Sequence, residues 1–396
     1  MKNLGVLFRY EMKKLWRRKL TWIIVILLAG IFSYSTINSQ RSGISGTFTI
    51  TNENGEEISQ YLSVNDQFKI RIEGSQLLSG QLIDESFFNT AKETIPLSAE
   101  SQDQKSYFLL IDPSYYDFYS FYGDYLNGSA QDFYSQRDES IKRNLQRADL
   151  SSDEMDYWEN IAEQVETPFV YQQISGGQAL LDVLGSGGIA IIIPLLAGIL
   201  LCELFSQERR TKVDKLIFST QRGRFPLYLA KVLAGEISVL LAVAIISGVS
   251  IATNLLVYGY SSLSGAIQLL PWLWSSILPI TIGQAALMLL VLLLTYGLLC
   301  GAITAMVSAL SGSGVVSLAI SIGIMLLTMQ QYDVSWVEYL PANLVDQHTF
   351  MSLTLTNIFG IKLNFFQSGL LLYMALAFLL FILCWLCWRW KATKCA

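Results

Sequence analysis

The chain from Ile237 to Tyr332 reads ISVLLAVAIISGVSIATNLLVYGYSSLSGAIQLLPWLWSSILPITIGQAALMLLVLLLTYGLLCGAITAMVSALSGSGVVSLAISIGIMLLTMQQY, which is 96 residues without Asp, Glu, Lys, Arg or His. The surface of a soluble domain has to be hydrated, so a domain of this size does not avoid charge for so long. A helix that spans a bilayer needs about 20 mainly apolar residues. The stretch is long enough for several such helices, and it predicts a protein embedded in a membrane.

The charged residues are divided unevenly between the segments that flank the apolar stretches. Residues 1–19 contain seven basic residues and one acidic residue, and residues 207–231 contain seven and two. The tail 389–396 adds three basic residues, whereas residues 39–186 contain 24 acidic and nine basic residues. Lys and Arg are retained in the cytoplasm during membrane insertion, so we expect the three basic stretches there and the acidic segment outside.

The order of apolar and polar segments predicts an α-helical polytopic membrane protein. It has six transmembrane helices, an N-terminal interfacial helix and an α+β or mainly α extracellular domain. The expected segments are an amphipathic cytoplasmic helix at 1–19, span 1 at 20–38, the extracellular domain at 39–186, span 2 at 187–205, a basic cytoplasmic segment at 206–228, span 3 at 229–257, an outer loop at 258–276, span 4 at 277–310, a cytoplasmic turn at 311–314, span 5 at 315–329, outer re-entrant or interfacial helices at 330–364, span 6 at 365–388 and a cytoplasmic tail at 389–396. Six crossings place both termini in the cytoplasm.

Local patterns predict some elements inside these segments. Gly46–Ile50 and Phe68–Ile72 alternate like short strands, and Ser151–Glu154 is typical of the start of a helix. In the membrane, Pro194 predicts a kink in the second span, and Gly297–Gly301 indicates a break in the fourth.

Several classes of function are disfavoured by what the chain lacks. It has no G-x-x-x-x-G-K-[ST] sequence, so it does not bind and hydrolyse ATP through a phosphate-binding loop. A single histidine, His348, argues against a His-based metal site. A proton-coupled carrier buries an ionisable residue near the middle of the membrane, but we expect Glu203 and Glu236 at the cytoplasmic ends of spans. Energy for any transport is therefore expected from another chain.

The basic segment after the second span is the main candidate for a functional surface. Val213, Leu216 and Ile217 are spaced i, i+3, i+4, so they would form one apolar face of a short helix surrounded by basic residues. Such a helix can dock into a groove on a soluble partner. It can equally be a basic loop that contacts lipid headgroups, and the periodicity leaves both interpretations open.

A wider set of residues in this region carries a resemblance to a known family. The set consists of Glu203, Glu208-Arg209-Arg210-Thr211, Lys215-Leu216, Ser219-Thr220, Arg222, Arg224 and Lys231. It resembles the signature that follows the second span in permease subunits of type-2 ATP-binding cassette (ABC) exporters, in the bacterial subgroup with a large extracellular domain between spans one and two. Arg210 stands where the family usually has glycine, and Gln221 stands where it usually has proline.

The resemblance implies a transmembrane permease subunit of an ABC exporter. Such a subunit moves its substrate out of the cell by alternating access, driven by a separate ATPase. The residues expected at the ATPase-coupling surface are Glu203, Glu208, Arg209, Arg210, Thr211, Val213, Lys215, Leu216 and Ile217. Five polar residues of spans three and four are candidates for the substrate path: Asn254, Thr281, Gln284, Thr295 and Tyr296.

The resemblance also implies the partners and the location. We expect two copies of a separate ABC ATPase, a second permease chain that is identical or paralogous, membrane lipid and no nucleic acid. The chain itself is expected to be no enzyme and to bind no cofactor or metal, with ATP and Mg²⁺ on the ATPase. It would lie in the plasma membrane of a bacterium and export a peptide or antimicrobial compound, a lipid or a drug. The alternatives are a non-transporting membrane sensor or scaffold with a ligand-binding extracellular domain, and a four-span mechanotransmitting ABC subunit.

Overall fold

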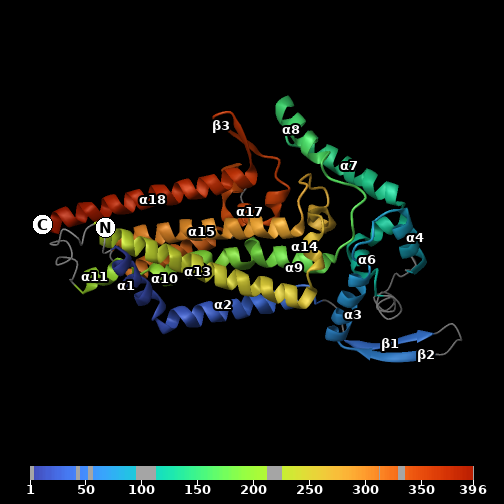
Figure 1. Cartoon of the computed structure of the whole chain (residues 1–396), viewed down its shortest axis with the longest axis horizontal. Coiled ribbons are helices and arrows are strands. Elements are labelled where there is room, and N and C mark those ends of the chain that lie inside the picture. The colour runs from blue at the N-terminus through green and yellow to red at the C-terminus, as the bar shows by residue number, and fades with distance from the viewer. Residues whose placement is uncertain are drawn as a thin grey trace.

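A computed structural model of the chain describes residues 4–41, 45–51, 57–94, 113–211, 225–311, 313–328 and 335–395. Long helices run side by side through most of the molecule (Figure 1). Both chain termini lie at one end of this bundle, which we call the termini end. A smaller, mainly helical domain lies at the opposite end, which we call the domain end.

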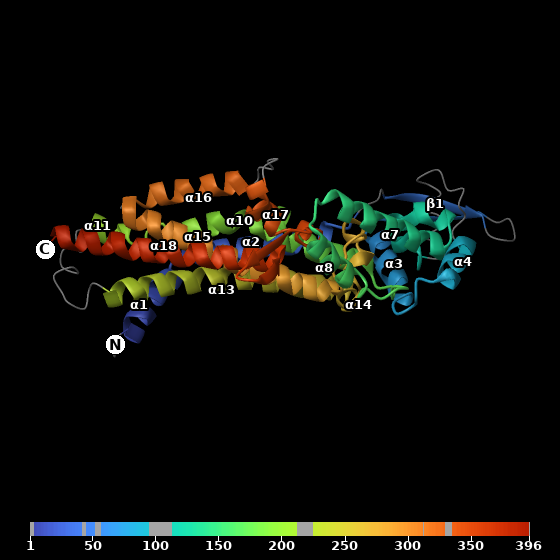
Figure 2. The same cartoon turned by 90° about the horizontal axis from the view of Figure 1, so that it is seen from above.

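The bundle consists of apolar helices that are long enough to cross a membrane. In the described part of the chain there are five such stretches: α2 (Lys19–Asn38), the run of α9 to α11 (Ile174–Glu208), α13 (Phe225–Tyr258), α15 (Ile282–Ser311) and the apolar part of α18 (Phe365–Cys395). A shorter apolar helix, α16 (Gly314–Thr328), packs against the second and fourth of these (Figure 2). The N-terminal helix α1 (Leu4–Trp16) packs against α13.

Glycines bring the long helices into close contact. The helix α15 is continuous from Ile282 to Ser311, so the expected break at Gly297–Gly301 is wrong. A Cβ on Gly301 would lie 2.4 Å from a carboxylate oxygen of Glu236 in α13, and a Cβ on Gly297 would touch Val239 and Val243. These glycines therefore let two helices approach each other, which is the usual role of small residues between membrane helices.

The second stretch is interrupted near the domain end. The helix α9 (Ile174–Leu184) is separated from α10 (Ile191–Leu201) by a π-helical turn, Ser186–Ala190. Gly188 in this turn has φ −104° and ψ −124°, and a Cβ there would lie 2.0 Å from the Val183 carbonyl oxygen. The helical geometry is thus lost at Gly188, while Pro194 lies inside α10.

The domain between α2 and α9, which we call the inserted domain, combines one β-hairpin with helices. The strands β1 (Gly46–Thr51) and β2 (Glu57–Leu62) pair antiparallel, with Gly46 opposite Leu62. The helices are α3 (Val64–Leu77), α4 (Glu85–Thr94), α6 (Tyr116–Tyr122), α7 (Ala130–Arg147) and α8 (Ser152–Ala162), with a 3₁₀ turn, η1, at Gly123–Asn127. Aromatic side chains fill the core of this domain, among them Phe88, Phe118 and Phe133.

Helix caps explain where three of these helices begin. Ser63, Ser129 and Ser151 each bond the carboxylate three residues later, which forms a capping box. The expected helix start at Ser151 is confirmed. The expected strand at Phe68–Ile72 is wrong, because the capping box at Ser63 starts α3 and carries these residues into a helix.

These capping boxes give the inserted domain an acid-sensitive component. Hydrogen bonds from the serines lower the pKa of Asp66, Asp132 and Glu154, of which the first two are exposed. A carboxylate whose pKa is lower in the folded state than in the unfolded state stabilises the folded state at pH values above the unfolded pKa. This contribution disappears as the pH falls through the folded pKa. We expect amide protection in the first turns of α3, α7 and α8 to fall on acidification, in hydrogen exchange corrected for intrinsic rates. Ser129→Ala should remove this pH dependence in α7 alone, and an unchanged profile would contradict the assignment.

At the domain end, short elements connect the long helices. Between α13 and α15 lie α14 (Ser261–Ser264) and two 3₁₀ turns, η3 (Ile267–Leu269) and η4 (Pro271–Leu273). Before α18 lie η5 (Ser335–Tyr339), α17 (Pro341–Leu344), η6 (Gln347–Phe350) and a hairpin of β3 (Leu355–Ile358) and β4 (Ile361–Asn364). The expectation of helices throughout 330–364 did not include this hairpin. Its turn places Phe359 and Gly360 at positive φ, 52° and 85°, and leaves the Phe359 side chain fully exposed.

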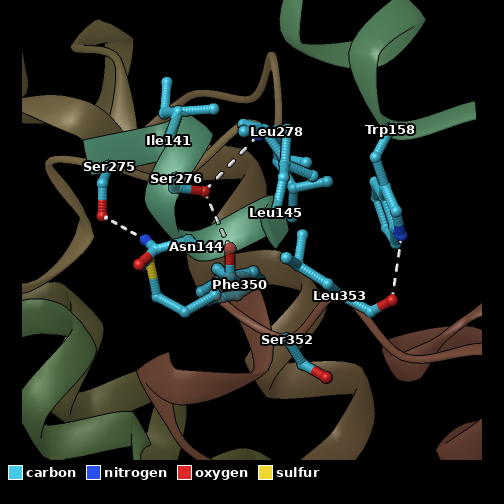
Figure 3. A pocket seen from close by; sticks show the side chains of 12 residues that line it. Ile141, Asn144, Leu145, Trp158, Ser275, Ser276, Leu278, Phe350, Ser352 and Leu353 are labelled. Carbon is cyan, nitrogen blue, oxygen red and sulfur yellow. Dashed lines mark hydrogen bonds between the residues drawn. The ribbon is translucent and has the colours of Figure 1, made fainter. Parts of the chain in front are cut away.

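Hydrogen bonds attach the inserted domain to these connections. The Trp158 indole of α8 donates to the Leu353 carbonyl oxygen (2.9 Å), and the Asn144 amide of α7 donates to the Ser275 hydroxyl (3.2 Å) (Figure 3). The Arg137 guanidinium donates to the carbonyl oxygens of Trp274 and Ser276, both at 3.1 Å. The cavity in Figure 3 has a volume of about 10 Å³, so it has room for no more than one water molecule. This contact is therefore a packed junction.

Candidate functional site

A buried lysine joins three elements at the termini end. Lys231, in the second turn of α13, has a fully buried side chain, and its ammonium lies 2.7 Å from Glu208 and 3.5 Å from Glu11. It also donates to the Leu204 carbonyl oxygen at 3.0 Å. Glu11 belongs to α1 and Glu208 to α11 (Ser206–Arg210). The lysine thus links the N-terminal helix, the end of the second stretch and the start of the third.

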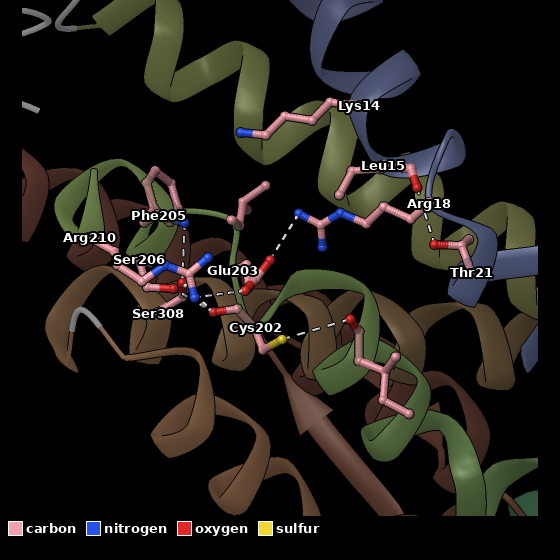
Figure 4. Close-up of polar contacts among 12 residues, drawn as sticks. Lys14, Leu15, Arg18, Thr21, Cys202, Glu203, Phe205, Ser206, Arg210 and Ser308 are labelled. Atoms are coloured by element: carbon pink, nitrogen blue, oxygen red, sulfur yellow. Dashed lines mark hydrogen bonds and ion pairs between the residues drawn. The ribbon is translucent and has the colours of Figure 1, made fainter. Parts of the chain in front are cut away.

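Glu203 forms a second charged junction next to the first. One carboxylate oxygen lies 3.4 Å from the Arg18 guanidinium, and the other lies 3.5 Å from that of Arg210 (Figure 4). Arg18 lies between α1 and α2, whereas Glu203 lies in the turn that leads into α11 and Arg210 is the last residue of α11. These side chains are between 28% and 71% exposed, so solvent weakens the pairs more than those of Lys231.

Backbone groups of the same turn are held by α15. The Ser308 hydroxyl accepts a hydrogen bond from the Phe205 amide (3.2 Å) and donates to the Cys202 carbonyl oxygen (3.0 Å) (Figure 4). The Phe205 ring lies between Tyr228 and Trp388, with centroid distances of 6.1 and 5.1 Å. The turn that precedes α11 is thus fixed to three of the long helices.

The helix α1 is packed against α13 by polar and apolar contacts. The Trp16 indole donates to the Ser238 hydroxyl at 3.0 Å, and Leu15 is buried. Glu11, which is 4% exposed, also lies 3.9 Å from Lys14. Burial lowers the pKa of Lys14, and the charge of Lys231 lowers it further, while Glu11 opposes both. The face of α1 that carries Glu11 is therefore directed into the protein.

The structure describes only part of the expected coupling surface. Arg209 and Arg210 lie in α11, and the Thr211 hydroxyl donates to the carbonyl oxygens of Gln207 and Glu208. Four expected residues fall outside the described part of the chain: Val213, Lys215, Leu216 and Ile217. Their role stays a prediction. Glu208 lies shortly before residues 212–224, and Lys231 lies shortly after them. The contact between Glu208 and Lys231 therefore ties together the two ends of the segment between α11 and α13.

The residues expected along a substrate path lie at different levels of the bundle. Asn254 is buried and donates to the Gly176 carbonyl oxygen of α9 at 3.0 Å. Thr281 and Gln284 bond each other's backbone amides at the start of α15, at the domain end. Thr295 donates to carbonyl oxygens of its own helix, and Tyr296 is buried beside the Tyr373 ring, 6.0 Å between centroids. Their contact with substrate stays a prediction.

A polar cavity lies at the domain end, beside the interrupted second stretch. It has a volume of about 400 Å³ and is lined by hydroxyl groups of α2, the Asp182 and Asp346 carboxylates and His348. Asp346 accepts a hydrogen bond from the Ser186 hydroxyl at 2.6 Å and lies 3.8 Å from the His348 ring. Two carboxylates in one cavity favour a cationic group over an anionic one.

Three residues of the charged junctions were not among the residues expected at the coupling surface, although Lys231 is part of the set that carries the family resemblance. Glu11 is the one acidic residue of a basic arm, and Lys231 is the last basic residue before the long uncharged stretch. Each charge is costly to bury alone, which was the available sign that they have partners. Arg18 had no such sign, because it is one of several basic residues in its segment.

Comparison with known proteins adds evidence on the family. The family model described as ABC-2 family transporter protein matches residues 6–359, which includes the inserted domain, α11 and the charged junctions. No curated protein and no solved structure matches the chain. The match covers most of the chain and agrees with the resemblance of residues 203–231. The chain therefore belongs to the ABC-2 family of transporter proteins, as a multi-pass membrane permease subunit.

Proposed function

We propose that the chain is the permease subunit of an exporter, and that a separate ATPase drives it through the segment between α11 and α13. The observation that carries this proposal is the Lys231–Glu208 contact of 2.7 Å, which ties together the two ends of that segment. A movement imposed on the segment would be passed to both helices at once. It would also reach α1 through Glu11.

Two further features support this transmission of movement. Glu203 connects the same turn to Arg18, at the start of α2, and Ser308 connects it to α15. A force at the termini end would thus act on four of the long apolar stretches. At the domain end, the Asp117 carboxylate of α6 accepts hydrogen bonds from the Ile174 and Ser175 amides at the start of α9. The inserted domain would follow the second stretch as it moves.

The orientation in the membrane follows from charge. The termini end carries the basic residues of α1 and α11 and the basic tail, so we place it in the cytoplasm. The inserted domain, with its net charge of −14 from 23 acidic and nine basic residues, would then lie outside. We count α16 as a short sixth span, and with six spans both termini lie on the same side of the membrane.

The substrate class is suggested by the acidic surfaces on the outer side. The cavity lined by Asp182 and Asp346 lies at the domain end, next to the interruption of the second stretch. Together with the acidic inserted domain, it favours a substrate with a cationic group, such as a basic peptide. In the assembly we expect a second permease chain and two ATPase copies.

Purification of the tagged chain from its own membranes tests the proposal. We expect a protein with a nucleotide-binding loop to co-purify, and the complex to show ATP-dependent transport of a basic peptide in inside-out vesicles. The comparison is the same preparation from cells that carry a variant in which Glu203, Arg18 and Lys231 are all replaced by alanine. This preparation should lack the co-purifying ATPase. Absence of any ATPase from the wild-type preparation would support a sensor or scaffold instead.

A further inference from the structure

One carboxyl group lies inside the bundle without a described partner. Glu236 of α13 is 5% exposed, and neither carboxylate oxygen has a hydrogen-bond partner among the described residues. It faces α15 at Gly301, where an added Cβ would lie only 2.4 Å from one of these oxygens. The sequence placed Glu236 at the end of a span, but the structure buries it between two helices.

The position of Glu236 along α13 puts it at membrane depth. It is the twelfth of 34 residues, Phe225–Tyr258, so it lies about 17 Å from the start of a helix about 51 Å long. A hydrocarbon core of about 30 Å centred on this helix would begin about 10 Å from the start. The carboxyl group is therefore inside the apolar layer, where an ionised group without a partner costs several kcal/mol.

No described cation compensates the carboxylate. The titratable side chains that interact with it are Cys300 of α15 and Tyr228 of α13, neither of which carries a positive charge at neutral pH. Lys231 is the nearest lysine along the helix, and its ammonium is occupied by Glu11, Glu208 and a carbonyl oxygen. Toward α10, the neighbouring Gly235 packs against the apolar side chain of Leu201. The side chain is thus accommodated as a neutral carboxylic acid.

We propose that Glu236 is a proton-binding site that is filled while α13 and α15 are packed as in this structure and released when these helices separate. The proton leaves for water once the carboxyl group is hydrated, and the carboxylate takes one up again before the helices close. This rests on the proposed function in one respect, since alternating access supplies the separation. The packed state holds one more proton than the separated state, so rising pH favours separation, by up to tenfold per pH unit.

Infrared difference spectra of the purified protein test the site directly. The spectrum of Glu236→Gln is subtracted from that of the wild-type protein at neutral pH, without nucleotide. We expect a band of a protonated carboxylic acid, and a carboxylate band in its place would overturn the proposal. Glu236→Asp is a second variant, in which the acid band should shift instead of disappearing. This experiment needs no ATPase, so its result is independent of the proposed function.

The labelling rate of Cys300 tests the release. Cys300 is 1% exposed beside Gly301, near Glu236 of α13 and Tyr373 of α18, so a thiol reagent reaches it only when the helices packed around α15 separate. With the other four cysteines replaced by serine, the ratio of the wild-type rate to the Glu236→Gln rate should rise with pH by up to tenfold per unit. The ratio cancels the ionisation of the thiol itself. A ratio that stays constant from pH 6 to pH 9, roughly the range in which such a group titrates, would overturn the proposal.

Discussion

Replacing Lys231 with methionine is expected to destabilise the protein by about 3–5 kcal/mol. Methionine fills a similar volume but removes the cation, so Glu11 and Glu208 are left buried beside each other without compensation. The two carboxylates would repel, and the contact between α1, α11 and α13 would be weakened. The free energy of unfolding in mixed micelles, followed by tryptophan fluorescence, measures the effect.

Lys69→Met is the matched control for this prediction. Lys69 lies 3.7 Å from Glu73, and both side chains are more than 60% exposed, so its loss should change stability by less than about 0.5 kcal/mol. Adding Glu208→Gln to Lys231→Met should restore part of the lost stability, because it removes one of the uncompensated charges. If Lys231→Met were as stable as Lys69→Met, the buried ion pairs would not hold the termini end together.

Leu216→Asp is expected to lower ATP-driven export at least tenfold while leaving membrane insertion unchanged. Leu216 belongs to the apolar face predicted for the segment between α11 and α13, together with Val213 and Ile217. An unpaired charge in the centre of a docking surface typically costs 2 kcal/mol or more, which is about 30-fold in affinity. ATP hydrolysis by the partner should continue without transport, and both rates can be measured in vesicles.

Ser219→Asp serves as the control for Leu216→Asp. It introduces the same charge in the same segment, but about 110° away from the centre of the apolar face of a helix, and export should be close to that of the wild-type protein. Equal losses in both variants would mean that added negative charge, not the loss of an apolar contact, is responsible. Unchanged export by Leu216→Asp would exclude this face as the docking surface.

Features that depend on neighbouring residues could be predicted from the sequence. The capping signal at Ser151 correctly marks the start of α8, and the length of the apolar stretches correctly indicates membrane helices. The strand expected at Phe68–Ile72 failed because the capping box at Ser63 and Asp66 outweighed a short alternation of apolar residues. The turn at Phe359 has a weaker signal, since only the second of its two left-handed residues is a glycine, Gly360, and the first is a phenylalanine.

Features that depend on contacts distant in the sequence could not be predicted. Gly297 and Gly301 suggested a break in the fourth span, but their role is to admit α13, which is visible only when both helices are placed. The partners of Lys231 lie 220 residues before it in α1 and 23 residues before it in α11. A sequence pattern shows that such a charge needs a partner, but it does not identify that partner.

The accessibility of a cysteine at position 213 shows whether the segment between α11 and α13 lies in the cytoplasm, where an ATPase can reach it. In a Val213→Cys variant of a chain whose own cysteines are replaced, a membrane-impermeant thiol reagent should label inside-out vesicles but not intact cells. Labelling of intact cells would place the segment outside, where a cytoplasmic ATPase cannot drive it.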